Sequence, residues 1–309
     1  MRITSHLVRC GACAAALALL ATGAASVPAL AAGTSPVTLA PKDGAVGDLF
    51  GESTATSSNG AVTAVGSPEH NSAGAVYVFT KTGAKFSQTA ELAPGDPKAD
   101  EQFGQTVAIS GNGQTLVAAA PGAAGTSGSD QGAAYVFSDA SGTWTQTAKL
   151  TVPGTAELGT SLAISASGST IVAGSPTSNN DHGVAFVFTK SGGTFTQASE
   201  VLPPKNKTKA AFAAGSNTGM SASGSLIAFG APTATAGTAF ESGEVFVATK
   251  TSTGTWKLTG TDAEPHPVSD DDLGGGDQSV AVAGNGSAVI AGARAANGQT
   301  GQAIIFPVS

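Results

Sequence analysis

Short stretches of alternating apolar and polar residues, separated by small polar turns, run through most of the chain. Residues 105–110 alternate in this way, with Val107 and Ile109 on one face, and a glycine-containing turn then leads to residues 115–119. Asn-Gly and Ser-Gly steps suit tight hairpin turns, which need a backbone with positive φ. No segment keeps a 3.6-residue period, so the pattern predicts strands and almost no helix.

The same small polar turn recurs five times, each time in similar surroundings. The glycines that end these turns are Gly60, Gly113, Gly168, Gly224 and Gly286. Ten residues before them stand Phe50, Phe103, Leu158, Ala214 and Gly276, and eight residues after the first four stand Pro68, Pro121, Pro176 and Pro232. Constant offsets of this kind indicate one supersecondary unit that is used five times.

Each unit predicts four antiparallel strands. The third strand is the most apolar and is expected at residues 76–79, 134–137, 185–188, 245–247 and 303–306. The fourth strand begins with an aromatic residue, at Phe86, Trp144, Phe195 and Trp256. Four-stranded units of roughly 40–60 residues are typical of β-propeller blades. The sequence therefore predicts an all-β fold, a five-bladed propeller, with the recurring strand aromatics Phe86, Tyr135 and Trp144 in the core between blades.

The two ends of the chain predict how the ring closes. The fifth unit stops after its third strand, while residues 39–43 (Leu-Ala-Pro-Lys-Asp) repeat residues 92–96 (Leu-Ala-Pro-Gly-Asp) that follow the first unit. Residues 36–41 are therefore expected to pair with residues 303–306 as the missing strand of the last blade. Such pairing would leave no free sheet edge between the first and last blades.

The first 31 residues predict a secretory signal peptide. Arg2 and Arg9 form a basic start, residues 10–25 are apolar, and Ala29-Leu30-Ala31 supplies a small-residue cleavage site. The apolar run is shorter than the roughly 20 residues of a membrane-spanning helix, so no membrane insertion is expected. These features predict cleavage after Ala31 and a secreted, monomeric, single-domain propeller over residues 32–309. Both cysteines lie in the removed segment, so no disulfide is expected.

The repeated segments resemble a known family. Residues 50–68, 103–121 and 158–176 run from Phe-Gly or Leu-Gly to Gly-Ser-Pro or Ala-Ala-Pro, as FG-GAP repeats do. Such repeats form the propellers of integrin α-subunits and of many secreted bacterial proteins, which implies a propeller fold and a binding or adhesion role. Integrin propellers have seven blades, and their Asp-x-Asp-x-Asp-Gly loops bind calcium. Here the corresponding turns carry no carboxylate, so calcium binding does not carry over to this chain.

Composition and motifs exclude several functions. The chain has 14 Lys plus Arg against 21 Asp plus Glu, which speaks against nucleic-acid binding. It contains no H-E-x-x-H, G-x-S-x-G or phosphate-binding G-x-x-x-x-G-K-[ST] motif. His70, His182 and His266 stand in separate loops without the spacing of metal ligands. No metal, cofactor or enzymatic activity is therefore expected.

The charges predict where a partner would bind. Assigned to propeller geometry, most acidic residues fall on the face that holds the loops between strands 2 and 3 and between blades. The candidate ligand-binding residues of this face are Asp48, Asp100, Glu101, Glu157, Asp270, Asp271 and Asp272. An acidic face attracts cationic groups, so the predicted function is binding an extracellular protein or cell-wall polymer, and the acidic face favours a basic one.

A carbohydrate-active propeller, either a glycosidase or a lectin, is the alternative. Its candidate catalytic pair is Glu52 with Asp277, which lie near the innermost strands of the first and last units. Glycoside hydrolysis uses two carboxylates about 5–9.5 Å apart. Solvated carboxylates at the rim of a loop are the competing interpretation of the same pair.

Overall fold

The computed structural model describes residues 36–124, 130–204, 218–236, 239, 242–263, 268, 271–275, 279–296 and 300–308. Contacts divide the chain into a unit of residues 1–38 and a unit of residues 39–309. Of the first unit, only residues 36–38 are described, and they are exposed and without regular structure. The predicted signal peptide lies outside the described residues.

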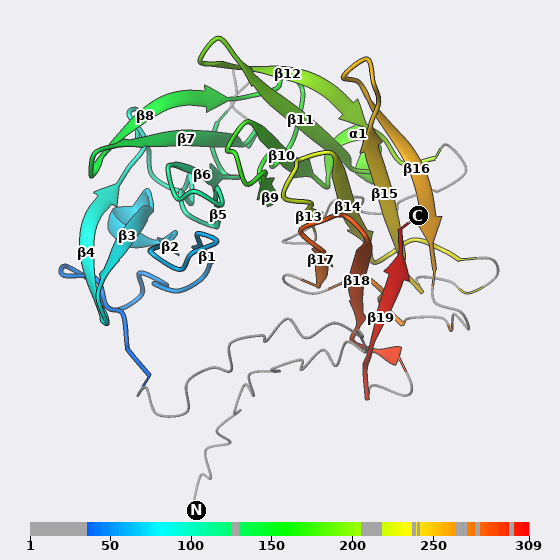
Figure 1. Ribbon diagram of the computed structural model, residues 1–309, viewed down its shortest axis with the longest axis horizontal. Coiled ribbons are helices and arrows are strands. Elements are labelled where there is room, and N and C mark those ends of the chain that lie inside the picture. Colours follow the sequence, from blue (N-terminus) through cyan, green and yellow to red (C-terminus); the bar gives the residue numbers. More distant parts are fainter. Residues whose placement is uncertain are drawn as a thin grey trace, which may run out of the picture. The chain divides into compact units, whose positions relative to one another are not determined.

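The second unit consists of five antiparallel sheets that follow one another along the chain (Figure 1). We call them blades 1 to 5. Blade 1 holds β1 (Thr54–Thr56), β2 (Val62–Ser67), β3 (Ala75–Thr82) and β4 (Lys85–Leu92). Blade 2 holds β5 (Thr106–Ile109), β6 (Thr115–Ala120), β7 (Ala133–Ala140) and β8 (Thr143–Leu150). Blade 3 holds β9 (Ser161–Ile164), β10 (Thr170–Ser175), β11 (Val184–Ser191) and β12 (Thr194–Val201).

The last two sheets complete the series. Blade 4 holds β13 (Thr218–Met220), β14 (Leu226–Ala231), β15 (Glu244–Lys250) and β16 (Trp256–Asp262). Blade 5 holds β17 (Val280–Val282), β18 (Ala288–Ala293) and β19 (Gln302–Pro307). The described helical segments are short, η1 (His70–Ser72) and α1 (Ser178–Asp181). The predicted all-β class and the five-sheet organisation are confirmed, and the arrangement is consistent with a propeller.

Every blade is a meander in strand order, because each hairpin or loop returns the chain beside the strand it has just left. The outer strand pair carries a register shift at the same point in four blades, between residues 78 and 79, 136 and 137, 187 and 188, and 247 and 248. A shift of this kind bends the strand and increases its twist. Its recurrence shows that the repeat extends to details of backbone geometry.

Apolar packing between neighbouring blades forms the core. Separate buried clusters join blades 1 and 2, blades 2 and 3, blades 3 and 4, and blades 4 and 5. A smaller cluster lies on the other face of blade 1, where Leu39 and Phe50 pack against Tyr77 and Phe79. The predicted place between blades is confirmed for Tyr135, which is fully buried in the cluster that joins blades 1 and 2, and Trp144 packs against the same cluster. Phe86 instead packs on the other face of blade 1.

The hairpin turns between the first and second strands are linked from blade to blade by backbone hydrogen bonds. Ser58 donates to the Gly111 carbonyl at 3.0 Å, Ala166 donates to the Ala222 carbonyl at 2.9 Å, and the Ala222 amide donates to Gly284 at 2.9 Å. Asn112 donates to Ala166 at 3.3 Å and completes the series from blade 1 to blade 5. These bonds orient the five innermost strands in succession.

Calcium should not stabilise these turns. In the first turn the Ser57 hydroxyl lies 2.8 Å from Asn59 Oδ1 and accepts the Val62 amide at 3.0 Å, and Ser110 and Asn112 repeat the arrangement. Hydroxyl and amide groups thus close each turn where a calcium loop would use carboxylates. We expect metal-free protein to melt at the same temperature with and without millimolar calcium. A calcium-dependent rise in the melting temperature would contradict this prediction.

The fifth repeat is spaced differently from the prediction. In blade 1 the Gly51 amide donates to the Gly66 carbonyl at 2.9 Å, and in blade 5 the Gly274 amide makes the equivalent bond to Gly292 at 2.8 Å. The fifth Phe-Gly position is therefore Leu273-Gly274, and its assignment to Gly276 was wrong because the approach to β17 is longer than in the other blades. Ala214, its predicted counterpart in blade 4, lies outside the described residues.

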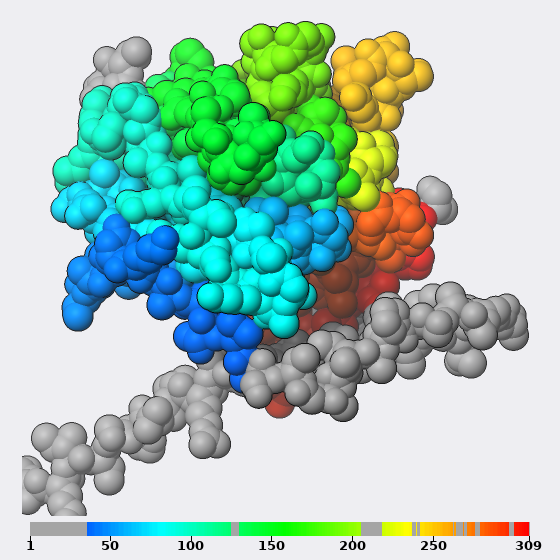
Figure 2. All heavy atoms as spheres, turned by 60° about the vertical axis from the view of Figure 1, so that its left-hand side comes forward, coloured from blue at the N-terminus to red at the C-terminus, as the bar shows by residue number. Residues whose placement is uncertain are grey.

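Among the described residues, β19 pairs with β18 and with no other strand. The predicted pairing of the N-terminal segment with residues 303–306 therefore stays a prediction. Leu39 packs on blade 1 as Leu92 packs on blade 2. This is the contact with blade 1 that is expected of a strand lying between blades 5 and 1. The segment that follows Leu39 lies at the surface of blade 1 (Figure 2), where the Lys42 amide donates to Gln88 Oε1 at 2.9 Å.

Candidate functional site

The loops between the second and third strands and between blades share one side of the described sheets, which we call the loop face. Gly74 forms a parallel bridge with Phe103, Gly132 with Leu158, and Gly243 with Leu273. Each bridge ties a loop of one blade to the entry segment of the next blade. The loop face is therefore built from short segments held by neighbouring blades, which is a rigid support for binding side chains.

Three of the seven predicted binding residues are buried, so their assignment to an exposed acidic face was wrong. Asp48, Glu101 and Asp271 are only 8%, 2% and 4% exposed. Asp48 Oδ2 accepts the Ala45 amide at 2.7 Å, and Asp271 Oδ2 accepts the Val268 amide at 2.6 Å. All three stand three residues before the second residue of the Phe-Gly pair or its counterpart. Their carboxylates cap the entry loop from inside.

The pKa values of the buried carboxyl groups of Asp48 and Glu101 are shifted in opposite directions. A hydrogen bond with His70, reinforced by the Ala45 amide, holds the pKa of Asp48 below its ordinary value. Burial raises the pKa of Glu101, and its Oε2 has no hydrogen-bond partner among the described residues. Asp48 is therefore a well-satisfied cap, whereas Glu101 has one oxygen that is desolvated without compensation.

The other four predicted binding residues differ in their partners and in whether the structure describes them. Asp272 pairs with the Arg294 guanidinium, so its charge is already balanced. Asp100 is exposed, and Glu157 is half-buried with its Oε2 accepting the Thr177 hydroxyl at 3.1 Å. Asp270 lies outside the described residues. Only Asp100 and Glu157 therefore remain from the predicted set as accessible carboxylates without a basic partner in the described part of the chain.

A polar groove of about 260 Å³ lies on the loop face between blades 2 and 3. We call it the loop-face groove. Its described lining residues are Gln102, Gln105, Pro121, Gly122, Asp130, Glu157 and Thr160. The Glu157 amide donates to the Asp130 carbonyl at 2.9 Å, which fixes the two acidic residues beside one another in the backbone. The groove thus combines two carboxylates, two amides and a hydroxyl, and none of these lining residues is basic.

Asp130 was not among the predicted site residues. It belongs to the loop between β6 and β7, whose length differs from blade to blade, so no repeat offset predicts its neighbours. The backbone bond to Glu157 brings it beside a residue of the following blade. The signal that could have identified it is the short sequence distance to Gly132, which marks the end of each such loop.

The predicted catalytic pair is not supported by the described residues. Glu52 is exposed, and its Oε1 lies 3.5 Å from Gln105 Nε2 of the next blade. Asp277 lies outside the described residues. A cavity of about 250 Å³ beside the innermost strands is lined by Ser53, Thr54, Thr106, Val107, Leu162, Thr218, Val280 and Ala281. None of these lining residues titrates near neutral pH, so they offer no general acid or base.

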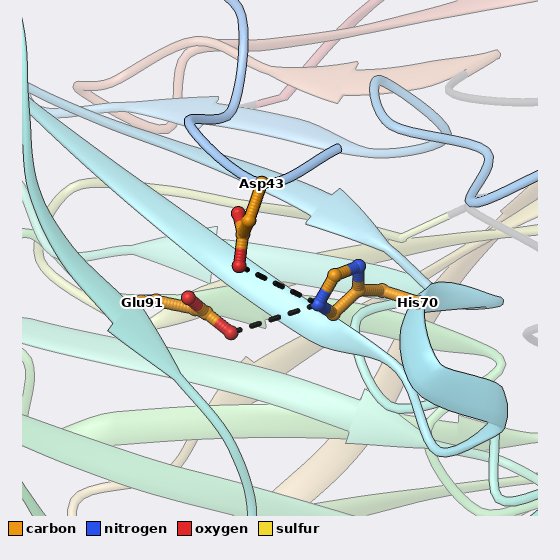
Figure 3. A group of neighbouring side chains, drawn as sticks. All are labelled: Asp43, His70 and Glu91. Carbon is orange, nitrogen blue, oxygen red and sulfur yellow. Dashed lines mark ion pairs between the residues drawn. The ribbon is translucent and has the colours of Figure 1, made fainter. Parts of the chain in front are cut away.

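A second polar cluster joins blade 1 to the N-terminal segment. Asp43, His70 and Glu91 point toward one another (Figure 3), although they come from the N-terminal segment, η1 and β4. His70 Nε2 lies 3.7 Å from Asp43 Oδ2 and 3.7 Å from Glu91 Oε1. The imidazole is 5% exposed. The sequence shows no metal-ligand spacing at His70, because the fold assembles these neighbours from residues that are far apart in the sequence.

The same place in blade 2 is occupied by a lysine–aspartate pair. Lys149 Nζ donates to Asp96 Oδ2 at 2.6 Å and lies 5.0 Å from the centre of the Tyr135 ring. The Tyr135 hydroxyl lies 3.3 Å from Asp96 Oδ1. Hydrogen bonding with Lys149 holds the pKa of Asp96 below its usual value. This cluster is an ion pair seated on an aromatic ring.

No helix of the described residues has the length and hydropathy needed to cross a membrane. No curated protein sequence matches the chain significantly. Among solved structures, the chain is similar to Kuenenia stuttgartiensis hydrazine synthase, with a TM-score of 0.51 and 17% identity over 82% of this chain and 64% of that chain. The chain thus spans less than two thirds of that protein's length.

The chain is also similar to the periplasmic gluconolactonase of Pseudomonas aeruginosa, with a TM-score of 0.55 and 13% identity over 83% of this chain and 68% of that chain. At such identities these similarities concern the fold alone. Residues 34–79 and 86–137 match the FG-GAP repeat. These two segments of the chain, within residues 34–137, are therefore similar to FG-GAP repeats.

Proposed function

We propose that the chain is a secreted binding module that takes a basic partner on its loop face. The observation that carries the proposal is the loop-face groove, where Asp130 and Glu157 stand together with no basic residue among the described lining. Carboxylates grouped in a concave, polar surface attract ammonium and guanidinium groups and speed their association. The predicted signal peptide and the FG-GAP repeats support an extracellular role.

The partner chemistry follows from the groove lining. Gln102, Gln105 and Thr160 supply hydrogen-bond donors and acceptors beside the two carboxylates. This combination suits amine-bearing polymers and lysine-rich or arginine-rich protein segments, since charge-assisted hydrogen bonds to carboxylates are stronger than neutral ones. Asp100 lies on the same face and extends the negative charge.

The double variant Asp130→Asn/Glu157→Gln tests the proposal. With immobilised polylysine and chitosan as probes, we expect about tenfold weaker binding at low salt and a flatter salt dependence. A matched variant, Glu69→Gln/Glu200→Gln, removes the same net charge from exposed residues that do not line the groove. Equal loss in both double variants would show that net charge alone attracts the probes and would contradict a site in the groove.

A carbohydrate-active propeller is the second candidate. The amides and the hydroxyl of the loop-face groove could equally hydrogen bond sugar hydroxyls, and this lining is the observation in its favour. A panel of chromogenic glycosides and neutral cell-wall polysaccharides distinguishes the two candidates. Turnover, or binding of neutral polysaccharides that the double variant abolishes, would favour the carbohydrate function over binding of a basic partner.

A further inference from the structure

Blades 1 and 2 carry side chains of opposite charge at one equivalent position of the repeat. In blade 1, Tyr77 stands opposite Glu91 in the pairing of β3 with β4. At the equivalent position of blade 2, Tyr135 stands opposite Lys149 in the pairing of β7 with β8. Asp43 and Asp96 approach the two positions in the same way, because the preceding amides donate to Gln88 and Gln146 at 2.9 and 2.8 Å. Blade 2 therefore supplies its own cation, and blade 1 has a carboxylate in its place.

Blade 1 also adds an imidazole that the other blades lack. The His70 carbonyl accepts the Gly74 amide at the end of the loop between the second and third strands. The residues that make this bond in the other blades are Ala123, Ser178, Ala234 and Ala296. All four are small and buried. Only in blade 1 does this repeat position carry a side chain that can bind a metal ion.

The imidazole of His70 is held in the orientation that a metal ligand needs. Its Nδ1 lies 2.8 Å from Asp48 Oδ2, and Asp48 is itself fixed by the Ala45 amide. A carboxylate on Nδ1 places the proton there and leaves Nε2 with a free lone pair, as in carboxylate–histidine–metal arrangements. Nε2 faces Asp43 and Glu91 (Figure 3).

A buried hydroxyl provides an independent observation. Tyr77 is fully buried, and its hydroxyl has no hydrogen-bond partner among the described residues. Its ring packs edge-on against His70 at 5.8 Å. Tyr77 also stands opposite Glu91 in the pairing of β3 with β4, which places it beside the cluster. An unpaired buried hydroxyl is costly, and this one faces the group of ligand atoms.

We propose that Asp43, His70 and Glu91 bind a divalent transition-metal ion, for which Zn²⁺ is the probe. The three ligand atoms lie within 4.8 Å of one another, and adjacent ligands of a tetrahedral zinc ion lie about 3.4 Å apart. The separations of 3.7 Å from His70 Nε2 need only small side-chain movements to reach that spacing. Tyr77 is placed to hydrogen bond a ligating carboxylate. The metal replaces the ammonium that Lys149 supplies in blade 2.

One contact must change when the ion binds. Asn71 Nδ2 lies 2.8 Å from His70 Nε2 and caps its lone pair. Asn71 is exposed, so its amide can swing into solvent without disturbing the core. One imidazole with two carboxylates suits zinc and neighbouring transition metals, whereas Ca²⁺ takes 6–8 oxygen ligands. The site would fasten the N-terminal segment to blade 1.

The experiment uses tag-free, EDTA-treated protein of residues 32–309. Zinc binding measured by calorimetry should give one site, and a hundredfold excess over the dissociation constant should raise the melting temperature by about 5 °C or more. His70→Ala should abolish both effects. The control His182→Ala removes a histidine outside the cluster and should retain them. Calcium should produce neither effect.

Glu91→Lys keeps the test decisive if loss of His70 disturbs folding. This substitution copies the blade 2 arrangement, because the new ammonium would pair with Asp43 as Lys149 pairs with Asp96. We expect Glu91→Lys to melt no lower than the metal-free parent and to lose its response to zinc. A parent that does not bind zinc, or a Glu91→Lys variant that still binds it, would overturn the proposal. Failure to bind zinc leaves the groove proposal untouched, because the two sites share no residue.

Discussion

Replacing Gly74 with alanine is expected to lower the free energy of unfolding by about 3 kcal/mol. A Cβ atom at this position would lie 2.1 Å from the Phe103 carbonyl oxygen and 2.6 Å from the Phe103 nitrogen, and φ is +93°. Both obstacles are backbone atoms, so neither can rotate away. Relief of the clash would separate blade 1 from the entry segment of blade 2, where Gly74 and Phe103 form their parallel bridge.

Gly83→Ala is the matched control. Gly83 also has a positive φ, of +62°, but a Cβ atom there would meet nothing within 4 Å. It should cost about 1 kcal/mol through backbone strain alone. Denaturant unfolding of both variants separates strain from the clash between blades. Equal losses would show that the contact between Gly74 and Phe103 is not a tight junction between blades.

The fold was predictable because its signals are local and repeated. Turn residues such as Asn59 and Gly60 act within their own hairpin, and the same offsets place the strands of every blade. The one misplacement, at Gly276, arose where blade 5 has a longer approach to β17 and the offset no longer holds. The parallel bridges between blades were not predictable, since they depend on three-dimensional positions that no local pattern encodes.

The candidate sites were less predictable than the fold, for two physical reasons. First, an acidic residue in a loop can face solvent or turn inward to accept backbone amides, as Asp48 does, and composition does not distinguish the two. Second, clusters form from distant segments, so Asp43, His70 and Glu91 give no spacing signal. The repeat itself held a clue, because Asp43 matches Asp96 while Glu91 replaces Lys149. Comparing equivalent positions between blades shows where one blade departs from its neighbours.

Deleting residues 32–41 is expected to destabilise the protein and cause it to aggregate. The deletion removes the half-buried Leu39 from its contacts with Tyr77 and Phe79, which costs about half of the roughly 1.5–3 kcal/mol that a fully buried leucine contributes. It would also remove the strand predicted to pair with β19. Residues 304–306 (Ile-Ile-Phe) would then lie on an unpaired edge, and Ile305 is already 53% exposed. An apolar, β-prone edge of this kind favours association between chains.

Two further variants separate ring closure from simple loss of Leu39. Leu39→Ala in the protein of residues 32–309 removes the side-chain contacts but keeps the backbone that would pair with β19. It should lower the melting temperature less than the deletion does and leave the protein monomeric in light scattering. Deleting residues 32–35 alone should change neither property, because the predicted strand begins at Pro36.

Moving residues 32–41 to follow Ser309 tests whether the segment restores the stability that its deletion removes. In this circular permutant the strand would follow β19 directly through a short turn, as the fourth strand follows the third in blades 1 to 4. If the segment completes blade 5, its spatial neighbours are unchanged and the permutant should melt close to the parent. A permutant as unstable as the deletion variant would place the segment elsewhere, and a deletion variant that melts like the parent would contradict closure by this strand. A permutant that melts close to the parent would show that the segment stabilises the protein whether it precedes blade 1 or follows blade 5. Only a position between blades 5 and 1 explains that result.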